Sequence, residues 1–171
     1  MAPTSATYRA PAAMTRTLPT WSALVVLLVS LVVAGPASAR PDGRSQLPFV
    51  WPAEGTVTSP YGVWRGDRRH EGIDIGMLRT LRLRAVADGV VRETGYANGY
   101  EGYGNVVVLD LPGPYSALYA HLSDVDVRVG ERVRAGKRLG LAGCTGSCSG
   151  THLHFELRRG GVPVDPLAFL P

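Results

Sequence analysis

From Phe49 onward the sequence predicts an all-β domain, an antiparallel β-sandwich or a partly closed barrel, with few or no helices. Short runs rich in Val, Ile, Leu and Tyr alternate with Gly, Pro, Asn and Asp, and the chain has 21 glycines available for tight turns. No segment shows a convincing amphipathic helical period. The 171 residues suffice for one compact domain with a single core, but not comfortably for two.

The expected strands follow one another with turn residues at each break. They cover residues 55–59, 73–76, 83–87, 89–94, 105–111, 115–122 and 153–158. The segment that precedes them, residues 40–48, is polar and rich in turn residues. We therefore expect a flexible lead-in at 40–48 and a single domain at 49–171.

Residues 1–39 differ in composition and predict a secretory signal peptide. They contain two arginines and no acidic residue, and an apolar run of 14 residues occupies 21–34. A small-x-small cleavage site, Ala37-Ser38-Ala39, follows. The alternative is an uncleaved membrane anchor, although a helix needs about 20 apolar residues to span a bilayer. We expect cleavage after Ala39, no stable membrane insertion afterwards, and a secreted, extracytoplasmic protein.

The charge of the chain gives no support for a nucleic-acid partner. The formal net charge is +4, and removal of residues 1–39 takes away two arginines and no acid, which leaves +2. The remaining arginines are scattered rather than clustered. A mildly basic surface suits an anionic cell wall, but it suits many other environments equally well.

Two histidines lie two positions apart in an alternating segment. In a strand, Leu153, Phe155 and Leu157 share one face that suits a core, whereas His152, His154 and Glu156 share the other. Imidazoles at i and i+2 lie about 7 Å apart at their Cα atoms, so they can reach one small site. The alternative is a strand with an ordinary polar face toward solvent.

His70 and Asp74 form a second candidate pair. Gly72 and the β-branched Ile73 argue against a helix here and favour a turn into the following strand. Such a turn brings both side chains toward one point and leaves Glu71 solvated. Two histidines and one carboxylate are a usual catalytic zinc set with a fourth position open for water. The alternative is a simple His–Asp hydrogen bond in a loop.

His121 ends the alternating run at 115–121, where a single histidine is more often structural than catalytic. The combination of residues changes this interpretation. Hydrolysis of an amide with zinc requires three ligands, a base near the water and a donor for the oxyanion. The four histidines of the chain and Asp74 supply that set.

Further motifs surround these residues between about Trp51 and Pro166. In order they are Ser59-Pro60-Tyr61-Gly62, His70-Glu71-Gly72-Ile73-Asp74, Ala85-Val86-Ala87-Asp88-Gly89-Val90-Val91, Gly104-Asn105-Val106-Val107-Val108, Tyr119-Ala120-His121-Leu122, Val129-Gly130-Glu131-Arg132-Val133-Arg134-Ala135-Gly136 and His152-Leu153-His154-Phe155-Glu156. On these motifs the chain resembles the M23 metallopeptidases of the lysostaphin and LytM type. A lone His-x-His is a weak signal, but the whole series in this order is a specific one.

The resemblance implies a LytM-like fold with a zinc-containing groove and one Zn²⁺ per chain. It implies His70, Asp74 and His154 as zinc ligands, and His121 and His152 beside the zinc-bound water. These two share the roles of general base and stabiliser of the tetrahedral intermediate. The implied protein is a monomeric zinc-dependent endopeptidase that hydrolyses peptide bonds in peptidoglycan stem peptides or cross-bridges at the cell wall.

Two other functions stay open at this point. Some family members have lost ligands and act as non-catalytic, wall-binding activators of another peptidoglycan hydrolase, but no catalytic position is substituted here. A protease for extracellular proteins such as elastin would use the same chemistry. Glycyl-glycine and D-alanyl-diaminopimelate bonds are both possible targets. Five aromatic residues are candidates for the groove wall, or equally for packing: Tyr61, Trp64, Tyr96, Tyr100 and Tyr103.

The two cysteines, Cys144 and Cys148, lie in the Gly-rich loop before His152, where relatives usually have Ser or Thr. In an exported protein this pair predicts a local disulfide that restrains the loop. The alternative of two extra zinc ligands conflicts with a set that already has three members. A redox switch is a further alternative without specific support.

Overall fold

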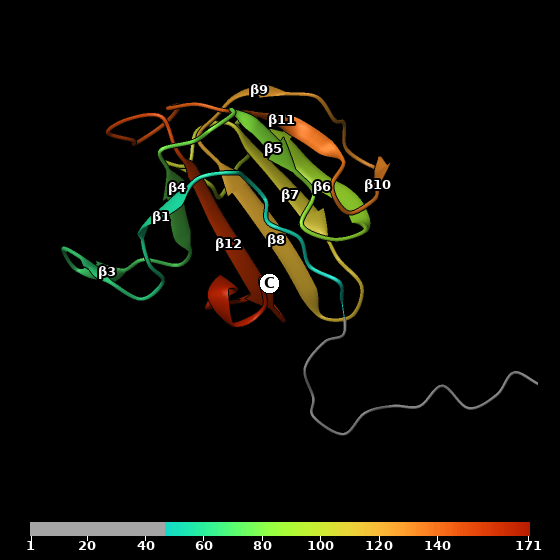
Figure 1. Ribbon diagram of the computed structural model, residues 1–171, viewed down its shortest axis with the longest axis horizontal. Coiled ribbons are helices and arrows are strands. Elements are labelled where there is room, and N and C mark those ends of the chain that lie inside the picture. The colour runs from blue at the N-terminus through green and yellow to red at the C-terminus, as the bar shows by residue number, and fades with distance from the viewer. Residues whose placement is uncertain (1–46) are drawn as a thin grey trace, which may run out of the picture. The chain divides into compact units, whose positions relative to one another are not determined.

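The computed structural model describes residues 47–171 (Figure 1). The expected signal peptide at 1–39 and almost all of the expected lead-in at 40–48 lie outside the described residues, and so does the expected cleavage site after Ala39.

The prediction of an all-β domain is confirmed. The strands are β1 (Thr56–Ser59), β2 (Trp64–Arg65), β3 (Arg68–Arg69), β4 (Ile73–Gly76), β5 (Arg82–Arg84), β6 (Gly89–Gly95), β7 (Val106–Asp110), β8 (Tyr115–Ala120), β9 (Leu122–Val125), β10 (Arg132–Val133), β11 (Arg138–Ala142), β12 (Leu153–Arg159) and β13 (Val162–Val164). A single 3₁₀ turn, η1 (Pro166–Ala168), is the only helical element within 47–171. Within residues 47–171 there is no helix that is long and apolar enough to cross a membrane.

Every strand pairing is antiparallel. The large sheet has the order β1-β4-β12-β8-β7-β6-β10, with β13 added beside β12. A three-stranded sheet has the order β5-β11-β9, and β2 and β3 form a separate hairpin. Figure 1 shows β12 and β8 side by side in the middle of the molecule, and the β3 hairpin projecting beyond β1 and β4.

The main core lies between the large and the small sheet. Phe155 of β12 and Tyr119 of β8 pack there against Leu83 of β5 and Leu139 of β11, and all four are buried. The hydroxyl of Tyr119 accepts a hydrogen bond of 2.7 Å from the backbone N–H of Val86, so this polar atom has a partner inside the core. Packing of two sheets around one core is the predicted sandwich arrangement.

The opposite face of the large sheet carries a second, smaller apolar cluster. Val106, Val108, Leu118 and Ala120 form it, and the connection between β6 and β7 covers it with Ala97, Tyr100 and Tyr103. Both faces of the central strands are therefore shielded from water. The candidate site residues of β4 and β12 lie on this second face, beside the cluster.

The expected strand at 115–122 is interrupted at His121. The backbone of this residue has φ 64°, in the left-handed region that side-chain-bearing residues rarely adopt. The interruption separates β8, in the large sheet, from β9, in the small sheet. His121 is thus the corner at which the chain passes from one sheet to the other, which a pattern of alternating residues does not reveal.

Candidate metal centre

Three predicted side chains converge on one point. The distance from His70 Nε2 to Asp74 Oδ1 is 3.1 Å, that from His154 Nδ1 to Asp74 Oδ1 is 2.9 Å, and the two nitrogens are 3.0 Å apart. One ligand-type atom from each of the three buried residues lies within 4.8 Å of the others. A set of two imidazoles and one carboxylate at this spacing can hold a metal ion.

The register of the large sheet places two of these residues. Asp74 of β4 is paired directly with His154 of β12, and His154 is paired on its other side with Ala120 of β8. Ser59 of β1 lies opposite Asp74, so a single row runs across four strands. The apolar neighbours Phe155 and Ile73 point into the main core, which fixes the opposite orientation for His154 and Asp74.

The third residue reaches the site through the expected turn at Gly72. A Cβ atom at Gly72 would lie 2.2 Å from the carbonyl oxygen of Phe155, so only glycine lets the loop pass this close to β12. The side chain of Glu71 pairs with Arg158 at 3.1 Å rather than with His70 or Asp74, and it is 49% exposed. His70 itself is buried against Asp74.

In His70 and His154, the ring nitrogen that faces away from the centre (the outer nitrogen) determines the protonation of the nitrogen that faces it. His70 Nδ1 donates to the carbonyl oxygen of Pro60 at 2.8 Å, and His154 Nε2 donates to Glu156 Oε1 at 3.0 Å. Carbonyl and carboxylate oxygens only accept, so these outer nitrogens carry the protons. In the neutral imidazoles the inner nitrogens are then unprotonated, and together with Asp74 they form three acceptors facing one another. Such a set fits a cation such as Zn²⁺.

The carboxylates around the centre are held in their charged form. Burial opposes ionisation of Asp74, but hydrogen bonds with His154, His70 and Arg65 hold its pKa well below the ordinary range. Arg65 pairs with the outer oxygen of this carboxylate, Asp74 Oδ2. Burial lowers the pKa of His154, but hydrogen bonds to Asp74 and Glu156 raise it to above its usual value. The centre therefore attracts positive charge.

Glu156 is the buried support of His154. It is 0% exposed and receives hydrogen bonds from Tyr103 Oη at 2.7 Å and from Arg158 Nε at 2.7 Å, besides that from His154. Burial would raise the pKa of Glu156, but the hydrogen bonds from His154 and Tyr103 lower it. The alternative of a solvent-facing polar side of this strand is therefore wrong, because both faces of β12 are covered.

The other two histidines lie beside the centre and are held differently. His121 Nδ1 donates to the carbonyl oxygen of Thr145 at 2.8 Å, and His152 Nδ1 donates to that of Gly150 at 2.7 Å. Their ring centroids are 4.8 Å apart, and His152 Nε2 lies 3.8 Å from Asp74 Oδ1. Burial lowers the pKa of His121 and favours its neutral form. In each neutral ring the Nε2 atom is left as an acceptor.

Two loops in contact with each other hold these histidines in place: the loop between β11 and β12 (residues 143–152) and the connection between β6 and β7 (residues 96–105). Thr145 Oγ1 donates to the carbonyl oxygen of Leu122 at 2.9 Å, and Ser147 N–H donates to that of Gly102 at 2.7 Å. Gly146 has φ 70°, and a Cβ atom there would lie 2.4 Å from the backbone nitrogen of Gly104. The predicted disulfide between Cys144 and Cys148 is present and constrains the β11–β12 loop, with Cα atoms 5.5 Å apart.

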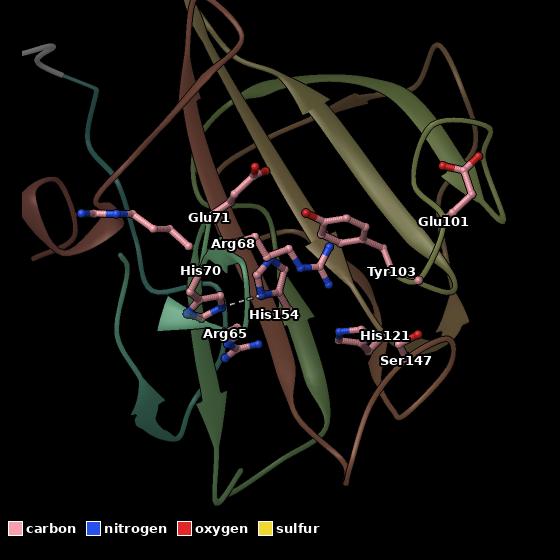
Figure 2. A pocket seen from close by; sticks show the side chains of 11 residues that line it. Arg65, Arg68, His70, Glu71, Glu101, Tyr103, His121, Ser147 and His154 are labelled. Atoms are coloured by element: carbon pink, nitrogen blue, oxygen red, sulfur yellow. Dashed lines mark hydrogen bonds between the residues drawn. The ribbon is translucent and has the colours of Figure 1, made fainter. Parts of the chain in front are cut away.

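A groove opens at this centre (Figure 2). Its lining residues are Arg65, Arg68, Arg69, His70, Glu71, Glu101, Gly102, Tyr103, His121, Ser147 and His154. Of the five aromatic candidates, only Tyr103 lines it. Tyr61 donates to the carbonyl oxygen of Pro163, Tyr100 packs in the second cluster, and Trp64 is 66% exposed on the β2–β3 hairpin.

Sequence reasoning gave no functional role to Glu156, Arg65 or Arg68. Signals for them were present, since Glu156 shares a strand face with both histidines of its motif, and the arginines closely precede His70. All five predicted site residues, in contrast, lie at the groove or directly beside it.

Comparisons with known proteins agree with this geometry. The murein hydrolase activator NlpD of Escherichia coli is 39% identical over 121 residues, which are 71% of this chain and 31% of that protein. This chain thus spans about a third of the length of that relative. A zinc-containing peptidase from Vibrio cholerae has a similar structure with TM-score 0.64 and 29% identity, over 72% of this chain and 41% of the other.

The catalytic domain of the antimicrobial peptidase lysostaphin from Staphylococcus simulans is also similar, with TM-score 0.56 and 32% identity over 67% of this chain and 89% of that domain. The model of peptidase family M23 matches residues 68–166, which include the whole candidate metal centre. Since this match covers more than half of the sequence, the chain belongs to peptidase family M23, a family that acts on peptidoglycan.

Proposed function

We propose that this protein is a zinc-dependent endopeptidase that hydrolyses peptide bonds in the stem peptides or cross-bridges of bacterial peptidoglycan. The observation that carries the proposal is the convergence of three acceptor atoms, from His70, Asp74 and His154, at an open groove that the two histidines line. Two further histidines with a free acceptor nitrogen stand beside them. A site that only stabilised the fold would need no such pair.

The three converging atoms would be the ligands of one zinc ion. When bound, zinc supplies a Lewis acid for the scissile carbonyl and for a water molecule. The protein's own contribution is to hold the ligands rigid: the carbonyl of Pro60 orients His70, and Glu156 orients His154. Such preorganisation leaves the ligands in place before the substrate arrives.

His121 and His152 would handle the protons of the reaction. A neutral imidazole takes a proton from the attacking water at its free Nε2, while the carbonyl bonded to Nδ1 fixes the ring orientation. A protonated imidazole donates to the developing oxyanion or to the leaving amine. Both rings lie close enough to each other to act on the same substrate bond.

A non-catalytic activator is the second candidate, and the similarity to NlpD, itself named a murein hydrolase activator, favours it. An activator needs the groove but has no need of a complete ligand set. In His70 and His154 the ring nitrogen that faces away from the centre is hydrogen-bonded to a fixed oxygen, and both His121 and His152 are present beside the centre. Catalysis accounts for these features better than activation does. These features support the endopeptidase as the primary proposal.

The proposed place of action is the cell wall, outside the cytoplasm. The Cys144–Cys148 disulfide supports it, because disulfides persist in oxidising compartments. The apolar segment and the small-x-small triplet before residue 40 support export by a signal peptide. We propose a monomer, with peptidoglycan peptides as its ligands.

The test combines zinc analysis with release of amino groups from purified peptidoglycan sacculi. We expect about one zinc per chain, amine release that stops with a chelator, and its return when zinc is added back. Bound zinc without amine release on sacculi of several chemotypes would contradict the endopeptidase. Stimulation of a separate wall hydrolase in the same preparation would then support the activator.

A further inference from the structure

One wall of the groove is basic and belongs to the β2–β3 hairpin. Arg65, Arg68 and Arg69 of this hairpin all line the groove, and they lie within the five residues before His70. Two of the three arginines have partners within the protein. Arg65 pairs with Asp74 and donates to Ser59 Oγ at 2.9 Å, and the guanidinium of Arg69 stacks over the ring of Trp64 at 4.9 Å.

Arg68 is different, because its guanidinium forms no hydrogen bond or ion pair with any of residues 47–171. It is exposed, and Figure 2 shows its side chain extended toward the groove near His154 and Tyr103. A guanidinium presents several donors in a planar fork that matches a carboxylate. Arg68 is thus an unpaired anion-binding group beside the candidate metal centre.

The opposite wall has the opposite character. Glu101, Tyr103 and Ser147 form it, and Glu101 is the only charged group among these three. Figure 2 shows Glu101 and Ser147 on the far side of His121 and Tyr103 from Arg68. A peptide bound across the groove gains most when a negative group faces the hairpin. A neutral glycyl bridge has no such group along its length.

We propose that Arg68 binds a free carboxylate next to the scissile bond, and that the preferred substrate is a D-alanyl-diaminopimelate cross-link. This inference rests on the proposed endopeptidase function. In such a cross-link the carbon that bears the scissile nitrogen also bears a carboxylate. Hydrolysis adds one water across the C–N bond and yields the alanine carboxylate and the free amine of diaminopimelate. The adjacent carboxylate is unchanged and stays available to Arg68 throughout.

The experiment uses two soluble cross-linked peptides that differ only at this carboxylate, which is free in one and amidated in the other. Hydrolysis is measured as kcat/KM for the zinc-loaded wild type, Arg68→Gln and Arg132→Gln. Arg132 lies on β10 at the far edge of the large sheet, so its variant is a control for loss of one positive charge. Binding of both peptides is measured by calorimetry in zinc-loaded His121→Ala, with and without Arg68→Gln.

We expect the wild type and Arg132→Gln to prefer the free acid by about 10- to 100-fold, the size of a charge-assisted hydrogen bond. Arg68→Gln should bring that ratio close to one in both assays. If the wild type cuts and binds the free and the amidated peptide equally well, or if the preference for the free acid persists in Arg68→Gln, the role of Arg68 is overturned but the peptidase function is not. Failure of the wild type to cut either peptide counts against the endopeptidase, while the binding ratio still decides the role of Arg68.

Discussion

The four histidines form two pairs that the fold treats differently. In the inner pair, His70 and His154, both ring nitrogens have partners, one toward the centre and one toward a fixed oxygen outside it. In the outer pair, His121 and His152, only Nδ1 has a backbone partner at hydrogen-bonding distance. Full constraint suits a ligand that must not move, and a free nitrogen suits a group that must exchange protons.

The pairs also differ in the part of the fold that positions them. The inner pair depends on the register of β4 and β12 and on the close approach at Gly72. The outer pair depends on loops, with His121 at the corner between two sheets and His152 at the end of the disulfide-closed loop. Metal binding and proton transfer should therefore be separable by mutation, and the following predictions test this from the largest effect to the smallest.

Asp74→Ala should abolish both zinc binding and hydrolysis. The substitution removes one of three ligands and leaves two imidazoles facing each other without the carboxylate between them. Zinc content by elemental mass spectrometry should fall from about one per chain to background. Retention of full zinc with normal activity would show that this carboxylate is not part of the metal centre.

His121→Ala and His152→Ala should keep their zinc and lose about 100- to 10,000-fold in kcat/KM, the range of general acid–base catalysis. Since His121 has φ 64°, His121→Asn is the matched control, because Asn tolerates this backbone while removing the imidazole. If His121→Asn hydrolyses sacculi at the wild-type rate, the imidazole has no part in the reaction. Zinc loss in either alanine variant would show that the outer pair also contributes to metal binding, and would contradict the separation of the two pairs.

Glu156→Gln should weaken zinc binding by about 10- to 100-fold, because the side chain that orients His154 loses its charge. It should also lower the free energy of unfolding by about 1–3 kcal/mol, because Arg158 loses a buried charged partner. Glu71→Gln is the control, since Glu71 binds the same Arg158 but is half exposed. Glu71→Gln should lower the free energy of unfolding by less than about 1 kcal/mol and leave zinc affinity unchanged. Equal effects of the two variants would contradict a specific role for Glu156.

The double variant Cys144→Ser/Cys148→Ser should affect the outer pair alone. Opening of the loop loosens the carbonyls of Thr145 and Gly150, so kcat/KM should fall by about tenfold or less while zinc content stays the same. The free energy of unfolding should decrease by about 2 kcal/mol, the loop-entropy value for a ring this short. A loss of zinc in this double variant would show that the loop also supports the inner pair.

The sequence predicted the fold class, and it predicted five candidate site residues that lie together in the structure, because the signals for both are local. The alternation of Leu153, Phe155 and Leu157 assigned one strand face to the core, and the structure confirms it. The burial of Glu156 on the other face was not predictable in this way. That face is covered by the connection between β6 and β7, which is distant in sequence and supplies Tyr103.

The corner at His121 escaped prediction for a related reason. The run at 115–122 alternates as one strand should, and nothing local requires a left-handed residue there. The conformation is held from outside, since His121 N–H donates to the carbonyl oxygen of Tyr103 at 2.9 Å and its ring donates to Thr145. Strain of this kind is stable only where surrounding contacts determine it.

The row of Ser59, Asp74, His154 and Ala120 across four strands would link the proposed zinc binding to correct folding. A shift of β12 by one residue would turn His154 into the apolar layer and Phe155 out of it. A chain that folded with this error would lose its hydrophobic contacts and its candidate metal ligands in the same step. During refolding, the fraction of molecules that capture zinc should therefore follow the fraction that has reached the native state, and metal uptake becomes a direct count of correctly folded protein.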